Sequence, residues 1–147
     1  MERICTHQYH QFGNELGMAF QMYLDENRSI MPTSTYFCFD PNEPFISKAL
    51  MPYLSEPKVF KCPGDTIARY YDRYKSSYEY DNSLSDQAYS QLKSGRRDQT
   101  TDKKNIQVIY DRGNYHNTSH VTFGQALIPP PRNYLYADWH VSDREMQ

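Results

Sequence analysis

Apolar side chains recur at helical spacing through residues 1–27, and this stripe constrains the fold more than any other stretch of the chain. The intervals are four, three, four, three and four residues, at positions Cys5, Tyr9, Phe12, Leu16, Ala19 and Tyr23. Phe20 and Leu24 widen the stripe into a face. Because an α-helix has 3.6 residues per turn, the pattern predicts a long N-terminal amphipathic helix that packs on other elements.

The sequence also indicates where this helix ends and what one side of it can accept. The acidic residues 25–26 leave the stripe, Asn27 suits a left-handed C-terminal cap, and Pro32 prevents an early restart. Gly13 and Gly17 lie four residues apart and therefore share one side of the helix. They leave a notch in which another backbone can approach the helix.

Residues 28–147 have the patterns of an irregular α/β head. A second, shorter helix is expected over 45–54, with Pro44 at its first turn. Strands are expected at 58–62, 74–80, 106–110 and 133–137, and a short helix through Leu84, Ala88 and Leu92. A length of 147 residues favours a single domain, 1–147. The predicted fold is α+β, with the helix of 1–27 on a small antiparallel sheet.

Charge and hydropathy narrow the classes of partner. The chain has 16 Lys and Arg against 18 Asp and Glu, so it lacks the basic excess of a nucleic-acid-binding protein. Its apolar runs all fall short of the roughly 20 residues of a membrane span. The 14 Tyr and 7 Phe supply core material, because a tyrosine buries its ring while its hydroxyl reaches a polar partner.

The polar residues offer few candidates for chemistry. His116 and His120 have a metal-ligand spacing, but the glutamate of a zinc protease helix is absent between them. Asp111 and Asp138 each follow an expected strand, and carboxylates suit a hard cation such as calcium. We expect no cofactor; if a metal ion binds, we expect a hard cation such as calcium near Asp111 and Asp138. The sequence contains no nucleophile elbow, P-loop or dinucleotide fingerprint, so we expect a protein without enzymatic activity.

Three cysteines leave one over when two pair. Cys38 and Cys62 lie outside the first helix and flank the expected second helix. A disulfide between them would close a loop worth about 3 kcal/mol in chain entropy. This hypothesis leaves Cys5, on the helical stripe, as the odd cysteine.

Five stretches in sequence order resemble segments of the prepilin-type family with a C-terminal H-X9-DG motif, which belongs with type II secretion pseudopilins and type IV pilins. They are Gly17–Asn27, Leu50–Leu54, Val59–Asp65, Ser77–Asn82 and Asn133–Val141. The first resembles the end of the family's helix, the second its L-x-P-Y-L, the third its F-x-C-P-x-D, the fourth its S-Y-x-x-N and the last its N-x-L-F-A-D-G-H-V. Two positions of the C-terminal motif differ, since Trp139 replaces its Gly and Ile128 its His.

The resemblance implies a pilin-like periplasmic domain that serves as a structural subunit of a pseudopilus-like envelope filament or secretion apparatus. Its expected partners are other pseudopilin subunits, bound through the N-terminal helix. It also implies an inner-membrane anchor, formed by an apolar segment of about 20 residues upstream of Met1. Because the family often has cysteines at both positions, a Cys5–Cys62 disulfide is the alternative to Cys38–Cys62.

Two other functions remain open at this level. An extracytoplasmic glycan-binding module would stack sugars on exposed tyrosines and on Trp139. A metal-dependent hydrolase would need a polar pocket that joins His116, His120 and Asp111. Exposed coplanar aromatic rings would favour the first alternative, and such a pocket would favour the second.

Overall fold

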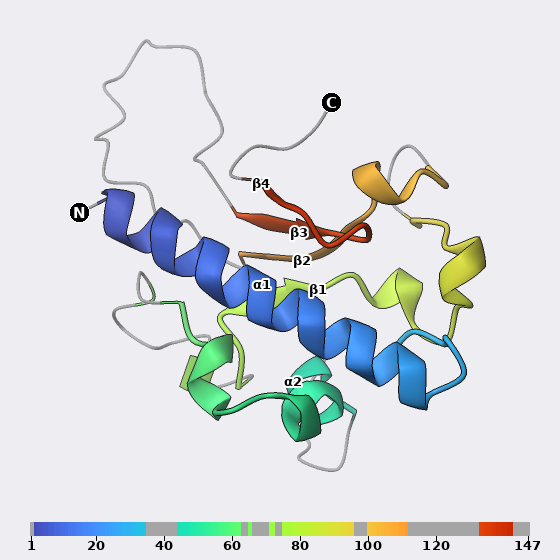
Figure 1. The fold of residues 1–147 in the computed structure, drawn as a ribbon, viewed down its shortest axis with the longest axis horizontal. Helices are drawn as coiled ribbons and strands as arrows, with labels where there is room; N and C mark the ends of the chain where they lie inside the picture. Colours follow the sequence, from blue (N-terminus) through green and yellow to red (C-terminus); the bar gives the residue numbers. More distant parts are fainter. Residues whose placement is uncertain are drawn as a thin grey trace, which may run out of the picture.

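Helix α1 (Glu2–Glu26) lies across a four-stranded antiparallel sheet in the computed structural model of the chain (Figure 1). The structure describes residues 2–34, 44–62, 65, 71–72, 75–95, 100–111 and 133–142, with only the backbone for 2–13. The strands are β1 (Tyr78–Tyr80), β2 (Gln107–Asp111), β3 (Tyr134–Tyr136) and β4 (Val141–Ser142), in the order β1-β2-β3-β4. Each strand pairs with its neighbour in sequence, and β1 and β4 are the two edges.

Short helical turns fill the connections. Helix α2 (Ile46–Leu50) continues into the 3-10 helix η1 (Met51–Tyr53), and α2 lies below α1 in Figure 1. The other 3-10 helices are η2 (Pro57–Phe60), η3 (Asn82–Leu84), η4 (Tyr89–Gln91) and η5 (Lys103–Asn105). The second helix expected over 45–54 therefore agrees with α2 followed by η1.

The core lies between the inner face of α1 and the sheet. Strand β2 is the best-protected element, since all five of its residues are buried. It sits between β1 and β3, with Tyr80 opposite Ile109 and Leu135 opposite Ile109 on the other side. Among the described side chains of α1, those in the core are Leu16, Ala19, Phe20 and Leu24, which all belong to the apolar face that the sequence predicted.

The predicted fold class, a long N-terminal amphipathic helix packed on the sheet in a pilin-like arrangement, is wrong. The structure shows a four-stranded antiparallel sheet and a helix whose described side chains span 13 residues, Asn14–Glu26, so it supports packing of a short helical segment and not of a long one. The strands have two to five residues, so the sheet is at most roughly 17 Å long at about 3.3 Å per residue.

The end of α1 differs in detail from the expectation. The residues in the left-handed region are Arg28 (φ 56°) and Ser29 (φ 58°), and Asn27 is not among them. Asn27 instead caps the helix with its side chain, because its Nδ2 donates to the carbonyl of Tyr23 at 2.8 Å. The amide of Ser29 donates to the carbonyl of Leu24 at 2.8 Å, which satisfies another terminal carbonyl.

Two local predictions in the middle of the chain are also wrong. Residues 58–62 are not a strand, since Pro57 opens the 3-10 helix η2 over most of that stretch. The expected helix through Leu84, Ala88 and Leu92 is broken into η3 and η4. Its N-terminal end is held by the side chain of Asp81, and Ala88 forms an isolated antiparallel bridge with Ile30 instead of a helical bond.

Candidate functional site

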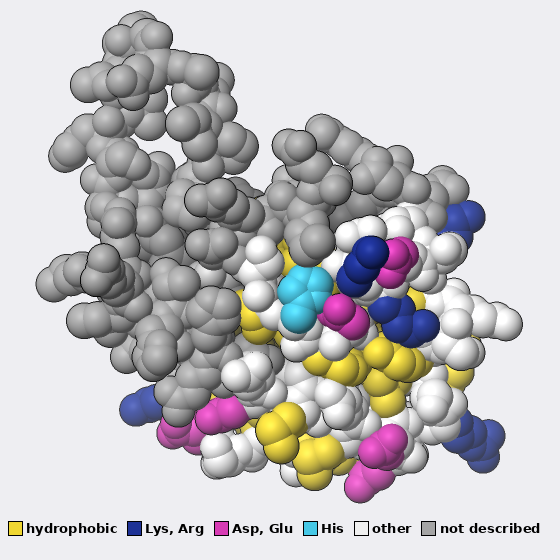
Figure 2. Space-filling model, turned by 45° about the horizontal axis from the view of Figure 1, so that its top comes forward, with side chains coloured by type: hydrophobic (Ala, Val, Ile, Leu, Met, Phe, Trp, Pro, Cys, Tyr) yellow, Lys and Arg dark blue, Asp and Glu magenta, His cyan; other side chains and the backbone are white. Residues whose placement is uncertain are grey.

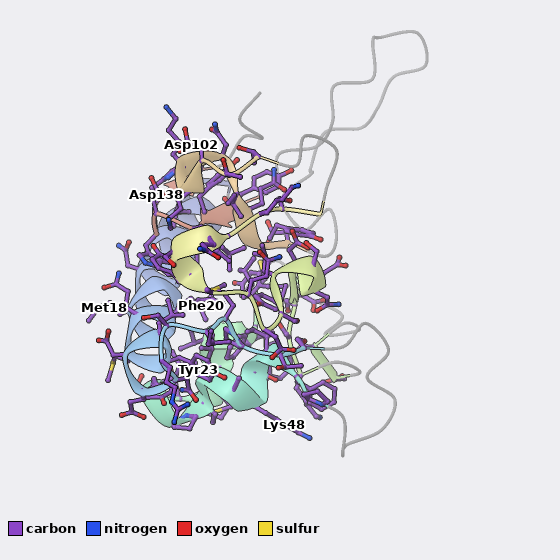
Figure 3. All side chains as sticks on the ribbon, turned by 90° about the vertical axis from the view of Figure 1, so that its right-hand side faces the viewer. Met18, Phe20, Tyr23, Lys48, Asp102 and Asp138 are labelled. Atoms are coloured by element: carbon purple, nitrogen blue, oxygen red, sulfur yellow. The ribbon has the colours of Figure 1, made fainter. Side chains whose placement is uncertain are left out.

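The outer side of α1 carries two exposed methionines. Met18 and Met22 are 63% and 48% exposed, and among the described residues they are the large hydrophobic side chains open to solvent. They follow the exposed Asn14 at steps of four, so the three lie on one line along the helix. We call the two exposed methionines on this line, Met18 and Met22, the outer face of α1. Figure 3 shows Met18 directed away from the molecule, whereas Phe20 and Tyr23 lie toward its interior.

The outer face is held in a fixed orientation by the opposite side of the helix. Leu16, Ala19 and Phe20 are fully buried, so α1 cannot rotate about its axis without exposing them. Between Asn14 and Glu26 the helix has acidic residues and no lysine or arginine. The outer face is therefore an apolar strip on an acidic helix. Flexible methionine side chains are common at protein-binding surfaces, because they adapt to the shape of a partner.

Trp139 lies in the turn between β3 and β4, where it forms the middle of a column of rings. Its indole stacks on Phe20 of α1 at 5.2 Å between ring centroids and on Tyr89 of η4 at 5.7 Å. Lys103 continues the column, with its Nζ 5.0 Å from the centre of the Tyr89 ring. The indole and the Tyr89 ring thus each contact two other side chains of the protein. The glycan-binding module that would stack sugars on exposed tyrosines and on Trp139 stays an untested alternative.

Gly17 accounts for the approach of this turn to α1. A Cβ atom at Gly17 would lie 3.3 Å from the Cβ of Trp139 and 3.9 Å from a methyl group of Leu135. The notch that the sequence indicated at Gly17 is therefore filled by the end of β3 and the turn that follows it. Trp139 has φ 70°, the left-handed conformation that favours glycine.

Asp138 and His140 form a polar pair beside the column. Oδ1 of Asp138 contacts Nδ1 of His140 and accepts the backbone N–H of His140 at 3.2 Å. The imidazole also stacks on Tyr136, with ring centroids 4.5 Å apart. Burial raises the pKa of Tyr89, and the negative charge of Asp138 raises this pKa further. Asp138 and Asp102 lie at the same end of the molecule in Figure 3.

The two carboxylates expected to share a calcium ion are not brought together. Asp111 ends β2 and is fully buried, where its Oδ2 accepts from the amide of Asn133 at 2.9 Å and from its Nδ2 at 3.2 Å. Asn133 precedes β3 and Asp138 follows it, so the length of β3 separates the two carboxylates. Within the described ranges, no group of three or more His, Cys, Asp or Glu could hold a metal ion. A calcium ion at Asp111 or Asp138 stays an untested prediction.

The remaining predicted residues fall mostly outside the described ranges. His116 and His120 lie there, as do Cys38 and the side chain of Cys5. Cys62 is described and fully buried beside η2. The structure therefore does not test the metal-dependent hydrolase that would join His116, His120 and Asp111. It does not test the two disulfide hypotheses either.

The surface around the ring column mixes charges of both signs. Figure 2 shows basic, acidic and histidine side chains gathered beside an area of hydrophobic ones. Lys104 lies 3.5 Å from Asp102, and both are exposed. Because positive and negative groups pair here, this area lacks the excess charge that attracts a phosphate or nucleic acid.

The outer face of α1 was missed in the sequence. The buried stripe by itself gives no role to Met18 and Met22, although their spacing of four residues places them together on the helix. The usable signal was this second apolar line on the polar side of an amphipathic helix.

No solved structure, curated protein or protein-family model matches this chain. Over the described residues, no helix is both long and apolar enough to cross a membrane.

Proposed function

We propose that this chain is a structural subunit of a pseudopilus-like envelope filament or secretion apparatus and that it binds neighbouring subunits through the outer face of α1. The observation that carries the proposal is the exposure of Met18 and Met22 on a helix whose other side is anchored in the core. Burying exposed apolar side chains of this kind is a main source of affinity between subunits. The five sequence stretches that resemble prepilin-type proteins supply the class of assembly.

The same proposal specifies a cellular location and binding partners for the protein. Other pseudopilin subunits bind the helix, an upstream apolar segment anchors the protein in the inner membrane, and the described domain faces the periplasm. The subunit acts by binding its neighbours, and no catalytic step is part of the proposal. The acidic character of α1 selects neighbours that present apolar or basic groups, since like charges at a contact are unfavourable.

The test compares polar substitutions along one line of the helix. The amount of the double variant Met18→Ser, Met22→Ser in the cell-envelope filament fraction should be several-fold lower than that of the wild type. Shearing, sedimentation and immunoblotting of the full-length chain measure this amount. The control Asn14→Ser lies on the same line, one turn away, and should assemble as the wild type. Exposed substitutions change stability by only about 0.5 kcal/mol, so circular dichroism should show all variants folded.

Two results would count against the proposal. Normal recovery of the double serine variant in the filament fraction would show that the outer face of α1 is not the contact surface. Absence of the wild-type protein from every sedimentable envelope fraction would contradict the proposal that it is a filament subunit. In that case the contact made by Met18 and Met22 would have to be sought in a different assembly.

A further inference from the structure

The turn between β3 and β4 contains a backbone conformation that its residue does not favour. The amide of Trp139 donates to the carbonyl of Tyr136 at 2.8 Å, and the amide of Tyr136 donates to the carbonyl of His140 at 3.0 Å. Hairpin turns of this length place their last residue in the left-handed region, usually with glycine. Trp139 has φ 70° there, and a bulky aromatic residue with positive φ is strained. Strain of this kind persists only where surrounding contacts impose it.

The contacts that impose it come from two distant parts of the chain. Phe20 of α1 and Tyr89 of η4 both stack on the indole, and the hydroxyl of Tyr89 donates to the carbonyl of Ala137 at 2.7 Å. Gly17 leaves the space that the Cβ of Trp139 occupies. The indole therefore fixes the turn against α1, and opening the turn would release the backbone strain.

The strand that follows the turn adds little of its own. β4 has two residues, Val141 and Ser142, which are both only half-buried. It lies at the edge of the sheet and pairs with β3 at two positions. Edge segments with few buried contacts open at lower free energy than the core. Among the described residues, Trp139 and Val141 are the side chains of this segment that pack against the core, and Trp139 stacks on two rings.

We propose that Trp139 is a conformational latch, and that the turn and β4, residues 138–142, open as a unit while β1, β2, β3 and α1 stay folded. Opening uncovers the side of α1 at Gly17 and the outer backbone edge of β3. The latch combines a strained backbone, which favours opening, with a ring stack, which opposes it. The balance between the two can be shifted at Gly17 or at Tyr89 without touching the core strands.

Native-state hydrogen exchange of the folded protein tests the latch directly. The amide protons of Tyr136 and Trp139, which are bonded within the turn, should exchange at least about tenfold faster than the amide proton of Asp81, which donates to Val108. Their exchange should be insensitive to low denaturant concentrations. Trp139 is the only tryptophan, so its fluorescence should change before the far-ultraviolet circular dichroism is lost. Equal exchange for all three amides would overturn the proposal.

The variant Gly17→Ala separates the latch from general stability. Alanine favours a helix more than glycine does, so the circular dichroism midpoint should stay unchanged or rise. The new Cβ presses on the Cβ of Trp139, so exchange at Tyr136 and Trp139 should accelerate by about tenfold. Gly95→Ala is the matched control, because its Cβ would lie 2.8 Å from the Cβ of Ser83, away from the turn.

The control and the variant give opposite patterns if the latch exists. Gly95→Ala should lower the midpoint and change exchange in the turn only as far as it changes global unfolding. If Gly17→Ala instead leaves the turn unaffected, or lowers the midpoint and turn protection together, residues 138–142 do not open separately and the latch is wrong.

Discussion

At the scale of single residues, buried polar side chains fix the connections of this protein. Asp81 is 4% exposed and accepts from both the amide and the hydroxyl of Ser83, at 3.0 and 2.7 Å. Asp65 is 2% exposed and accepts from the hydroxyl of Ser77 at 2.8 Å. Buried carboxylates of this kind stabilise the fold only while their hydrogen bonds are complete.

Asp81→Ala should lower the free energy of unfolding by about 2 kcal/mol, because the hydrogen bonds to a charged acceptor are lost and Ser83 is left unsatisfied. Urea denaturation measures the change. Asp102→Ala is the matched control, since Asp102 caps η5 with the same backbone bond, to the amide of Lys104, but is exposed. We expect the control to cost at most about 1 kcal/mol. Equal losses in the two variants would show that burial does not matter at Asp81.

Tyr80 should make the protein less stable at alkaline pH. Burial raises its pKa far above the ordinary 10.0, and the charge of Asp81 raises it further. The folded state therefore keeps this proton after the unfolded state has lost it, so the contribution is complete below pH 10 and declines as pH rises above it. The decline is at most about 1.4 kcal/mol per pH unit.

Tyr80→Phe isolates this effect from the other tyrosines. The variant loses the hydrogen bond to the carbonyl of Pro32, so it should be about 1 kcal/mol less stable than the wild type near pH 8. Urea denaturation near pH 11 should show a smaller gap, because only the wild type pays the cost of keeping Tyr80 protonated. A gap that is constant with pH would contradict the raised pKa.

At the scale of elements, α1 has two faces with different tasks. Its inner face packs on the sheet through Leu16 and Phe20, and its outer face presents Met18 and Met22. Within the described side chains, Asn14 to Glu26, the inner face packs on four strands of two to five residues. The apolar contacts of the inner face carry the stability of this element.

Leu16→Ala should lower the free energy of unfolding by about 3 kcal/mol, since it opens a cavity at a fully buried position. Met18→Ala, two residues away on the outer face, should change it by no more than about 0.5 kcal/mol. Thermal and urea denaturation of the isolated chain measure both. A large loss in Met18→Ala would mean that the outer face is covered within the molecule and is not a contact surface.

At the scale of the whole molecule, a disulfide bond would join segments that are distant in the sequence. Cys62 is fully buried beside η2, and the two disulfide hypotheses join it to Cys38 or to Cys5. Peptide mapping without reduction should find a peptide that contains Cys62 joined to one that contains Cys38. Reduction should then lower the free energy of unfolding by about 3 kcal/mol. A Cys5–Cys62 peptide would favour the alternative, and three alkylatable thiols in oxidised material would exclude both.

The sequence by itself determined the elements whose pattern is local. Leu16, Ala19, Phe20 and Leu24 were identified as a buried face from spacing alone, because helical periodicity depends only on nearby residues. The central strands followed in the same way, since alternating or continuous apolar residues at 106–110 and 133–137 match β2 and β3 within a residue or two. The 3-10 helices η2, η3 and η4 were missed because proline and capping side chains there override weak apolar spacing.

Only the tertiary structure decided which distant residues meet. It set the length of the sheet under α1, because that length depends on strand pairing and not on the helix sequence. It placed Asp111 and Asp138 at opposite ends of β3, although both follow a strand in the sequence. It also set Trp139 in a left-handed turn between Phe20 and Tyr89. Local patterns specify which side of an element is apolar, but the partner that covers it is chosen by packing the whole chain.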